Sequence, residues 1–352
     1  MATPCKLLKL PLIVIEEVVG NMDFLELFNL SLCSQKSRKI ISIMRKTSSI
    51  FLSVKIDCDI KYIRVYSARN LGYIYLHWNF EECKKTGRSD CLMRRIGGMM
   101  TDTRHPSQNV LPDKVCDKFP QTSSYAPKNR MDLTMNAAIS HLLDTFHHCR
   151  IRSVRIFFDD LCTTFRASRA LKSIKSVSTL NIETKTFSSI PEVKFLLSNV
   201  EVTEDFRYNS LLSLGTIIAD KLNCSKSVRC GNSSWMQPET LWNMDCPYIW
   251  LRRTRFTSED IEEFLRRWKN SVGENKNKIE IVDISHPIGV TVDYEALDAK
   301  PWVPAARPEV FTAFGDPCWD CSKGMDIRRT DGRIGTIMRL TDNSMKFLVW
   351  PK

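Results

Sequence analysis

Cys318 and Cys321 have the spacing of a metal-binding or redox-active cysteine pair. A structural zinc ion needs two further ligands, and no second close pair of cysteine or histidine residues follows them. Cys224, Cys230 or His286 could complete such a site only through the fold. The alternative is a loop with two ordinary thiols, which we favour.

Two other groups contain residue types that are suited to catalysis. His147, His148 and Cys149 could form a nucleophile and its base, but no elbow or family signature surrounds them. Histidines at a helix end more often cap carbonyl groups. Asp159 and Asp160 could bind a metal, but their commoner role is to end a strand at a turn. We therefore predict a non-enzymatic protein with no catalytic residue, no cofactor and no metal.

The composition predicts a globular protein with a sizeable core, since 43% of the 352 residues are hydrophobic and 26% are charged. No apolar run approaches the ~20 residues that cross a bilayer, so we expect no membrane insertion. Thirteen unevenly spaced cysteines favour a reducing compartment, the cytosol or the nucleus. The net charge of +11 is spread along the chain, which favours a solvated surface; nucleic-acid binding is the alternative.

The elements that would position any site begin with three short helices between Leu10 and Lys46. Pro11 can begin the first helix, and Gly20-Asn21 can end it. Asp23 and Glu26 then have the spacing of a capping box at the start of the second helix. About forty residues cannot bury so many large aliphatic side chains alone, so either the rest of the chain or a partner must cover them.

This segment resembles an F-box, on Leu10-Pro11, the run 13–19 and the run 22–31. It departs from many F-boxes at Ile13, where they have Glu, and at Lys36, where they have Trp. The resemblance implies binding to a Skp-type adaptor, which in turn binds a cullin. The implied adaptor contacts are Leu10, Pro11, Ile15, Val18, Met22, Phe24, Leu25, Leu27 and Leu30.

The rest of the chain predicts a sheet. Alternation of apolar and polar residues predicts strands at 51–56, 62–66 and 72–78. The segment near 101–130 is rich in Pro, Ser, Asn and Asp and has little periodicity, which predicts a long loop or a poorly ordered insertion. From Leu133 onward, helical and extended segments alternate, which is typical of crossover units on a mostly parallel sheet. Such units can stack as a curved, leucine-rich-repeat-like solenoid, but their period is too irregular to establish repeats.

The clearest unit is a strand, helix and strand between Tyr248 and Ser285. Thr257 and Asp260 have capping-box spacing at the start of its helix. An antiparallel hairpin, formed by 334–340 and 345–350, should close the chain. This part, clearest over 235–351, resembles the nematode type-2 F-box-associated domain, which implies target capture.

The sequence therefore predicts an α/β (α+β overall) protein in three parts: an F-box at 1–50, a strand-rich connection at 51–132, and a target-binding domain at 133–352. Its expected function is substrate recognition in a Skp-cullin-F-box ubiquitin ligase, with an adaptor and a protein target as partners. The alternative is a nucleic-acid-binding or general interaction protein that is not linked to ubiquitination.

Overall fold

The computed structural model divides into two compact units, Met1–Val177 and Ser178–Lys352, which we describe separately. The residues that the structure describes are 7–43, 49–57, 60–69, 73–82, 92–96, 99–104, 120–158, 166–185, 190–210, 222, 224–271, 278–285, 291–312, 318–341 and 343–351.

The first unit begins with the three predicted helices, preceded by a short 3-10 turn, η1 (Leu7–Lys9). The helices are α1 (Leu12–Gly20), α2 (Phe24–Cys33) and α3 (Gln35–Ile43). The predicted capping box of α2 is confirmed, because the Glu26 amide donates to the Asp23 carboxylate over 2.8 Å and the Asp23 amide donates to the Glu26 carboxylate over 2.9 Å. A local sequence signal thus fixes where α2 begins.

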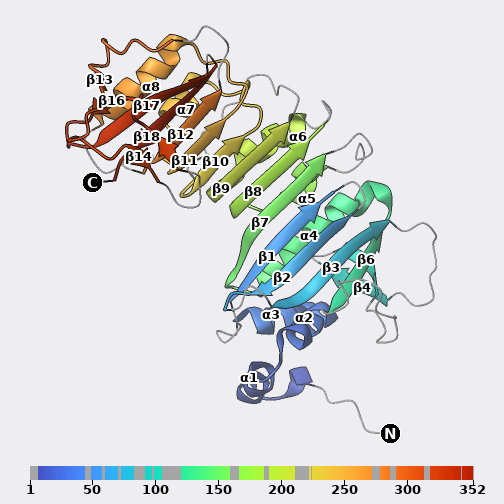
Figure 1. The fold of residues 1–352 in the computed structure, drawn as a ribbon. Coiled ribbons are helices and arrows are strands. Elements are labelled where there is room, and N and C mark those ends of the chain that lie inside the picture. The colour runs from blue at the N-terminus through green and yellow to red at the C-terminus, as the bar shows by residue number, and fades with distance from the viewer. Residues whose placement is uncertain are drawn as a thin grey trace. The chain divides into compact units, whose positions relative to one another are not determined.

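A mixed sheet follows the helices, with α4 (Met131–Thr145) packed against it (Figure 1). In spatial order its strands are β4, β5, β6, β3, β2, β1 and β7. Their bounds are β1 (Ile50–Ile56), β2 (Lys61–Ser67), β3 (Ile74–Glu82), β4 (Leu92–Ile96), β5 (Met99–Arg104), β6 (Gln121–Ala126) and β7 (Cys149–Phe158). The pairs β1–β7 and β3–β6 are parallel, and the others are antiparallel. Two short helices, η2 (Lys128–Arg130) and α5 (Ala167–Ala170), complete the unit.

The prediction of a loop over 101–130 is wrong at both of its ends. Strand β5 runs to Arg104, and β6 pairs with both β3 and β5. The buried positions of β6 are small, and two of the three are polar, which conceals its alternation: Thr122 and Ser124 are both buried, and Ser124 accepts a 2.9 Å hydrogen bond from the Trp78 indole. Residues 105–119 lie outside the described part of the chain.

In the second unit the strands stand in the order β8, β9, β10, β11, β12, β18, β17, β16 and β13, and β14 and β15 form a separate pair. The bounds are β8 (Ser176–Thr184), α6 (Ile190–Asn199), β9 (Glu201–Ser210), β10 (Ser227–Cys230), α7 (Pro238–Trp242), β11 (Tyr248–Leu251), α8 (Ser258–Asn270), β12 (Ile281–Ser285), β13 (Lys300–Pro301), β14 (Val310–Phe311), β15 (Trp319–Asp320), β16 (Met325–Arg328), β17 (Ile334–Thr341) and β18 (Ser344–Val349). Strands β9 to β12 are parallel to one another, whereas β18 runs antiparallel to β12 and β17.

The predicted strand–helix–strand unit is β11, α8 and β12, and the predicted hairpin is β17 and β18. Thr257 caps α8 in a capping box with Asp260, as expected. Trp268 of α8 packs edge-on against Phe347 of β18, with their ring centroids 4.9 Å apart. Helices α7 and α8 therefore lie on one face of this sheet (Figure 1). Among the described residues, none of the helices has the length and apolar character that spanning a membrane requires.

Candidate protein-interaction sites

One side of the N-terminal helices packs against the first unit's own sheet and α4. The Phe24 ring stacks on Tyr75 of β3, with centroids 5.1 Å apart, and lies 5.0 Å from the ring of Phe146. Phe28 meets Trp78 of β3 edge-on at 5.1 Å, and both rings are fully buried. These aromatic contacts fix α2 to the body of the unit.

Polar contacts strengthen the same junction. The Ser31 hydroxyl of α2 lies 2.8 Å from Nε2 of the buried His141 in α4, and Arg38 of α3 forms a 2.7 Å ion pair with Asp144. Burial, and then the nearby Arg38 charge, lower the pKa of His141 to about 4. His141 is therefore neutral at physiological pH, because burial and a nearby positive charge both disfavour the protonated imidazole.

The other side of the module exposes large apolar side chains. On α1, Leu12 is 63% exposed and Ile13 is 75% exposed. We call this surface the α1 patch, and its members are Leu10, Pro11, Leu12, Ile13, Val14 and Val18. Several large apolar side chains exposed together on one short helix are typical of a protein contact site.

The nine residues that the F-box resemblance implies as adaptor contacts fall into three groups. Leu10, Pro11 and Val18 are exposed, and Met22, Leu25 and Leu30 are half-buried. Ile15, Phe24 and Leu27 are buried within the chain itself, and their role as adaptor contacts stays a prediction.

Sequence reasoning missed the most exposed residues of the patch, Leu12 and Ile13, together with Val14. The pattern i, i+3, i+4 selected the face that α1 turns toward the protein, and Ile15 and Val19 on that face are indeed buried. The sequence did contain a signal for this exposure. The consecutive large aliphatic residues from Leu12 to Ile15 cannot share one helical face, so they cannot all be buried on the side of α1 that faces the protein.

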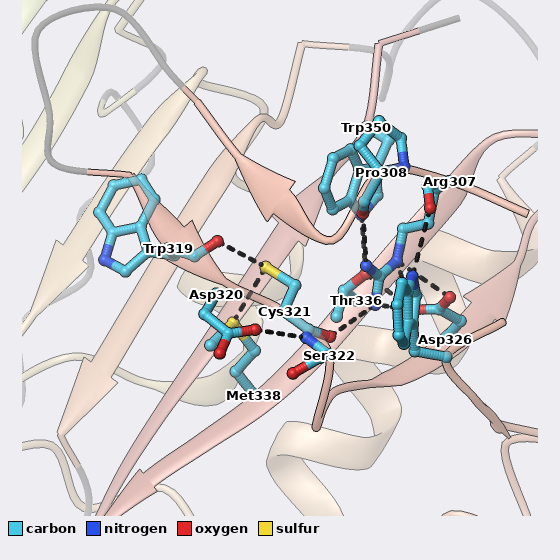
Figure 2. A network of polar contacts seen from close by, with 11 residues as sticks. Arg307, Pro308, Trp319, Asp320, Cys321, Ser322, Asp326, Thr336, Met338 and Trp350 are labelled. Carbon is cyan, nitrogen blue, oxygen red and sulfur yellow. Dashed lines mark hydrogen bonds and ion pairs between the residues drawn. The ribbon is translucent and has the colours of Figure 1, made fainter. Parts of the chain in front are cut away.

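In the second unit, a buried polar network holds the segment around Cys321 (Figure 2). The Arg307 guanidinium donates to both carboxylate oxygens of Asp326 over 3.0 Å and to the Cys321 carbonyl over 2.9 Å. It also lies over the Trp350 ring, 4.8 Å from the centroid. Thr336 donates to Asp326 and accepts from the Trp350 indole, each over 2.7 Å. The network orders the chain through bonds that are all satisfied within the protein.

Among the described residues, neither cysteine of the 318–321 pair has the surroundings of a metal ligand. Cys318 is exposed, whereas Cys321 is buried, and its thiol lies 3.4 Å from both the Trp319 carbonyl oxygen and the Met338 sulfur (Figure 2). Burial raises the pKa of the Cys321 thiol. No cluster of three or more potential metal ligands occurs within the described residues.

The other residues considered for catalysis are also separated by their surroundings. Burial raises the pKa of the Cys149 thiol to about 12, while His147 and His148 are exposed. A thiol with so high a pKa is protonated and is a poor nucleophile. Asp159, Asp160 and His286 lie outside the described residues.

Comparison with known proteins confirms the two family resemblances. The family model of the F-box domain matches residues 7–49, which include α1, α2 and α3. The F-box associated model matches residues 216–279, which include β10, α7, β11 and α8. The chain thus carries an F-box and a type-2 F-box-associated region, in that order.

Three relatives from Caenorhabditis elegans extend over nearly the whole chain. The uncharacterized protein F59B2.8 is 22% identical over 377 residues, which cover 99% of this chain and 78% of the relative. The uncharacterized protein F59B2.9 is 23% identical over 98% of this chain and 78% of its own length, and the uncharacterized protein F54H12.5 is 22% identical over 99% and 94%. No solved structure matches the chain.

Both matched families are of the adaptor type, in which the protein acts by binding rather than by chemistry. An F-box generally binds a Skp-type adaptor, and the two matched domains together suggest an F-box substrate-recognition protein. This class agrees with a chain whose candidate functional surfaces are contact surfaces.

Proposed function

We propose that this protein is the substrate receptor of a Skp-cullin-F-box ubiquitin ligase, which holds the adaptor with its α1 patch and a protein target with its second unit. The receptor then raises the effective concentration of target lysines near the ubiquitin-charged enzyme. It would act in the cytosol, the nucleus or both, where that ligase works.

The α1 patch is the observation that carries this proposal. The F-box match covers it, and its large aliphatic side chains are exposed although the same module buries Phe24 and Phe28 against the body. Covering an aliphatic side chain of this size is worth about 1.5–3 kcal/mol. Several such residues on one short helix support a stable contact with an apolar groove of the adaptor.

The proposal is tested by placing charge in the patch. Changing Leu12 and Ile13 together to Asp should lower the affinity for a Skp-type adaptor by about a hundredfold or more, because two apolar contacts are lost and two carboxylates are desolvated. The measurement is isothermal titration of purified adaptor into the full-length protein.

Ile60→Asp provides the matched control, since Ile60 is a 50% exposed aliphatic residue that lies between β1 and β2, outside the patch. It should leave adaptor affinity unchanged. Unaltered adaptor binding by the Leu12→Asp, Ile13→Asp variant would refute the proposed docking surface.

A further inference from the structure

The face of the second unit's sheet that is opposite α8 carries a row of charged and aromatic side chains. Strand register places Arg207 of β9 beside Arg229 of β10, Arg229 beside Trp250 of β11, Trp250 beside Asp283 of β12, and Asp283 beside Lys346 of β18. Successive side chains of a strand point to opposite faces.

The neighbouring row of the same strands identifies the two faces. Val228, Ile249 and Val282 are in register with Phe347, which packs against α8, and all four are buried. The row that contains Arg207, Arg229 and Trp250 therefore points away from α8.

The cations of this row fall into two groups. Lys346 and Arg252 both bind the carboxylate of Asp283, at 2.6 Å and 2.5 Å, and these two partners keep the pKa of Asp283 low although burial acts to raise it. Arg207 and Arg229 are exposed, and neither forms an ion pair with a carboxylate among the described residues.

Arg207 and Arg229 are also direct neighbours across parallel strands, which stand about 4.8 Å apart. Like charges directly opposite one another destabilise a sheet. An anion that bridges the two guanidinium groups would remove this repulsion, so the sheet itself favours an acidic ligand at this point.

Aromatic rings lie beside these cations. The Arg229 guanidinium lies 4.8 Å from the centroid of the Tyr248 ring, and the Arg252 guanidinium lies 4.6 Å from that of Trp250. A guanidinium stacked on a ring keeps its N–H edges available for a carboxylate. Directly after Arg252, the backbone of Arg253 has a φ of 54°, a strained conformation of the kind that clusters at ligand sites.

We propose that the arginine row, consisting of Arg207, Arg229 and Arg252, docks an acidic, Asp- and Glu-rich segment of the target protein. Carboxylates of the segment would accept charge-assisted hydrogen bonds from Arg207 and Arg229, and Trp250 would pack against its apolar groups. This inference rests on the proposed function and gives the target a chemical character.

The size of the row favours a peptide over nucleic acid. Proteins that hold a nucleic-acid backbone typically neutralise several phosphates, about six to ten in well-studied cases. Among the described residues, Arg207 and Arg229 lack a carboxylate partner. Arg252 shares its charge with Asp283, and Asp205 on β9 adds a negative charge nearby, bonded to Ser227. A few carboxylates match this limited excess of positive charge.

Fluorescence anisotropy with a labelled peptide of alternating Glu and Tyr residues tests the inference on the full chain. The Arg207→Glu, Arg229→Glu variant should bind the peptide about tenfold or more weakly, because two charge-assisted bonds become repulsions. The matched control is the Arg255→Glu, Arg328→Glu variant, which makes the same change of net charge at two exposed positions outside the row. It should leave peptide affinity nearly unchanged.

A charge-reversed peptide of alternating Lys and Tyr residues sharpens the test, since it should bind the Arg207→Glu, Arg229→Glu variant more tightly than the unmodified protein. Equal binding of the Glu-Tyr peptide by both double variants would overturn the inference. The inference would also be overturned if an RNA oligonucleotide of equal charge bound the protein more tightly than the Glu-Tyr peptide and lost that binding in the Arg207→Glu, Arg229→Glu variant.

Adaptor titration on the row variant separates this inference from the proposed function. We expect its adaptor affinity and thermal midpoint to be unchanged, because Arg207 and Arg229 are surface residues of the second unit. Normal adaptor binding with unaltered peptide binding would refute the arginine row alone, whereas failure of the Leu12→Asp, Ile13→Asp test would refute the adaptor surface.

Discussion

The α1 patch and the arginine row are exposed surfaces with opposite chemistry. The patch is a helical surface of aliphatic side chains such as Leu12 and Ile13, whereas the row is a strand surface of guanidinium groups beside aromatic rings. Apolar contacts depend weakly on salt, and contacts between exposed charges are screened by it. Salt should therefore separate the two proposed binding events of this chain.

The interiors beneath the two surfaces also differ in polarity. The F-box helices rest on buried rings, such as Phe28 against Trp78, while the second unit contains buried ion pairs, such as Arg307 with Asp326. Changes that disturb each interior while leaving its surface intact therefore test whether the two regions are built on different physics.

Phe28→Ala should have the largest effect. It removes a fully buried ring at the junction between α2 and β3, and such truncations cost about 3–5 kcal/mol. Urea unfolding followed by tryptophan fluorescence measures the loss. Leu12→Ala, a truncation in the exposed patch, should change the free energy of unfolding by less than about 0.5 kcal/mol. If both variants lost the same free energy of unfolding, this would contradict the division of the F-box helices into one side packed against the body and one exposed side.

Arg307→Met is the corresponding change in the second unit. It should cost about 3 kcal/mol or more, because the Asp326 carboxylate would lose its cation in a site where the arginine side chain is only 2% exposed. Arg328→Met, at a neighbouring exposed position, is the matched control and should have little effect on the same unfolding measurement. A small loss of unfolding free energy in Arg307→Met would mean that the Thr336 hydroxyl alone is enough to stabilise the Asp326 carboxylate.

His141 makes the junction of the F-box helices sensitive to acid. Its pKa is about 4 in the folded protein and near 6.5 when unfolded, so the unfolded chain binds an extra proton between these values and stability falls as pH falls through this window. The loss is about 3 kcal/mol at 1.36 kcal/mol per pKa unit. Urea midpoints at several pH values should show a smaller decline in His141→Gln, and an equal decline would exclude His141 as the cause.

The two capping boxes should give the smallest and most similar effects. Asp23 caps α2 in the first unit and Thr257 caps α8 in the second, each with the same reciprocal pair of bonds. Asp23→Ala and Thr257→Ala should each cost about 1 kcal/mol in urea unfolding. A much larger loss at Asp23 would indicate that this cap also positions the F-box against the body.

Local signals in the sequence predicted these elements well. Both capping boxes, the β11–α8–β12 unit and the closing hairpin depend on residues that are close along the chain, such as Thr257 with Asp260. Strand β6 was missed because Thr122 and Ser124 fill buried positions where apolar residues are expected, and the bond from the Trp78 indole to Ser124 joins residues far apart in the sequence.

The candidate sites depended more on distant contacts and were predicted only in part. Phe24 has the residue type of a partner contact, and its burial depends on Tyr75 and Phe146, which are far away in the sequence. Arg207 and Arg229 are 22 positions apart in the numbering and become neighbours only through the register of β9 and β10. A single sequence contains no signal for that register, so the arginine row could emerge only from the structure.

The bond between Ser31 and His141 has a consequence for the lifetime of the protein. Because α2 and α4 are joined there, a ligand that binds the F-box helices also resists unfolding of the sheet beneath them. An adaptor at a hundred times its Kd would add about 2.7 kcal/mol to that resistance. On the proposed function, molecules without a bound adaptor would then open more often, so that adaptor binding would prolong the lifetime of the protein.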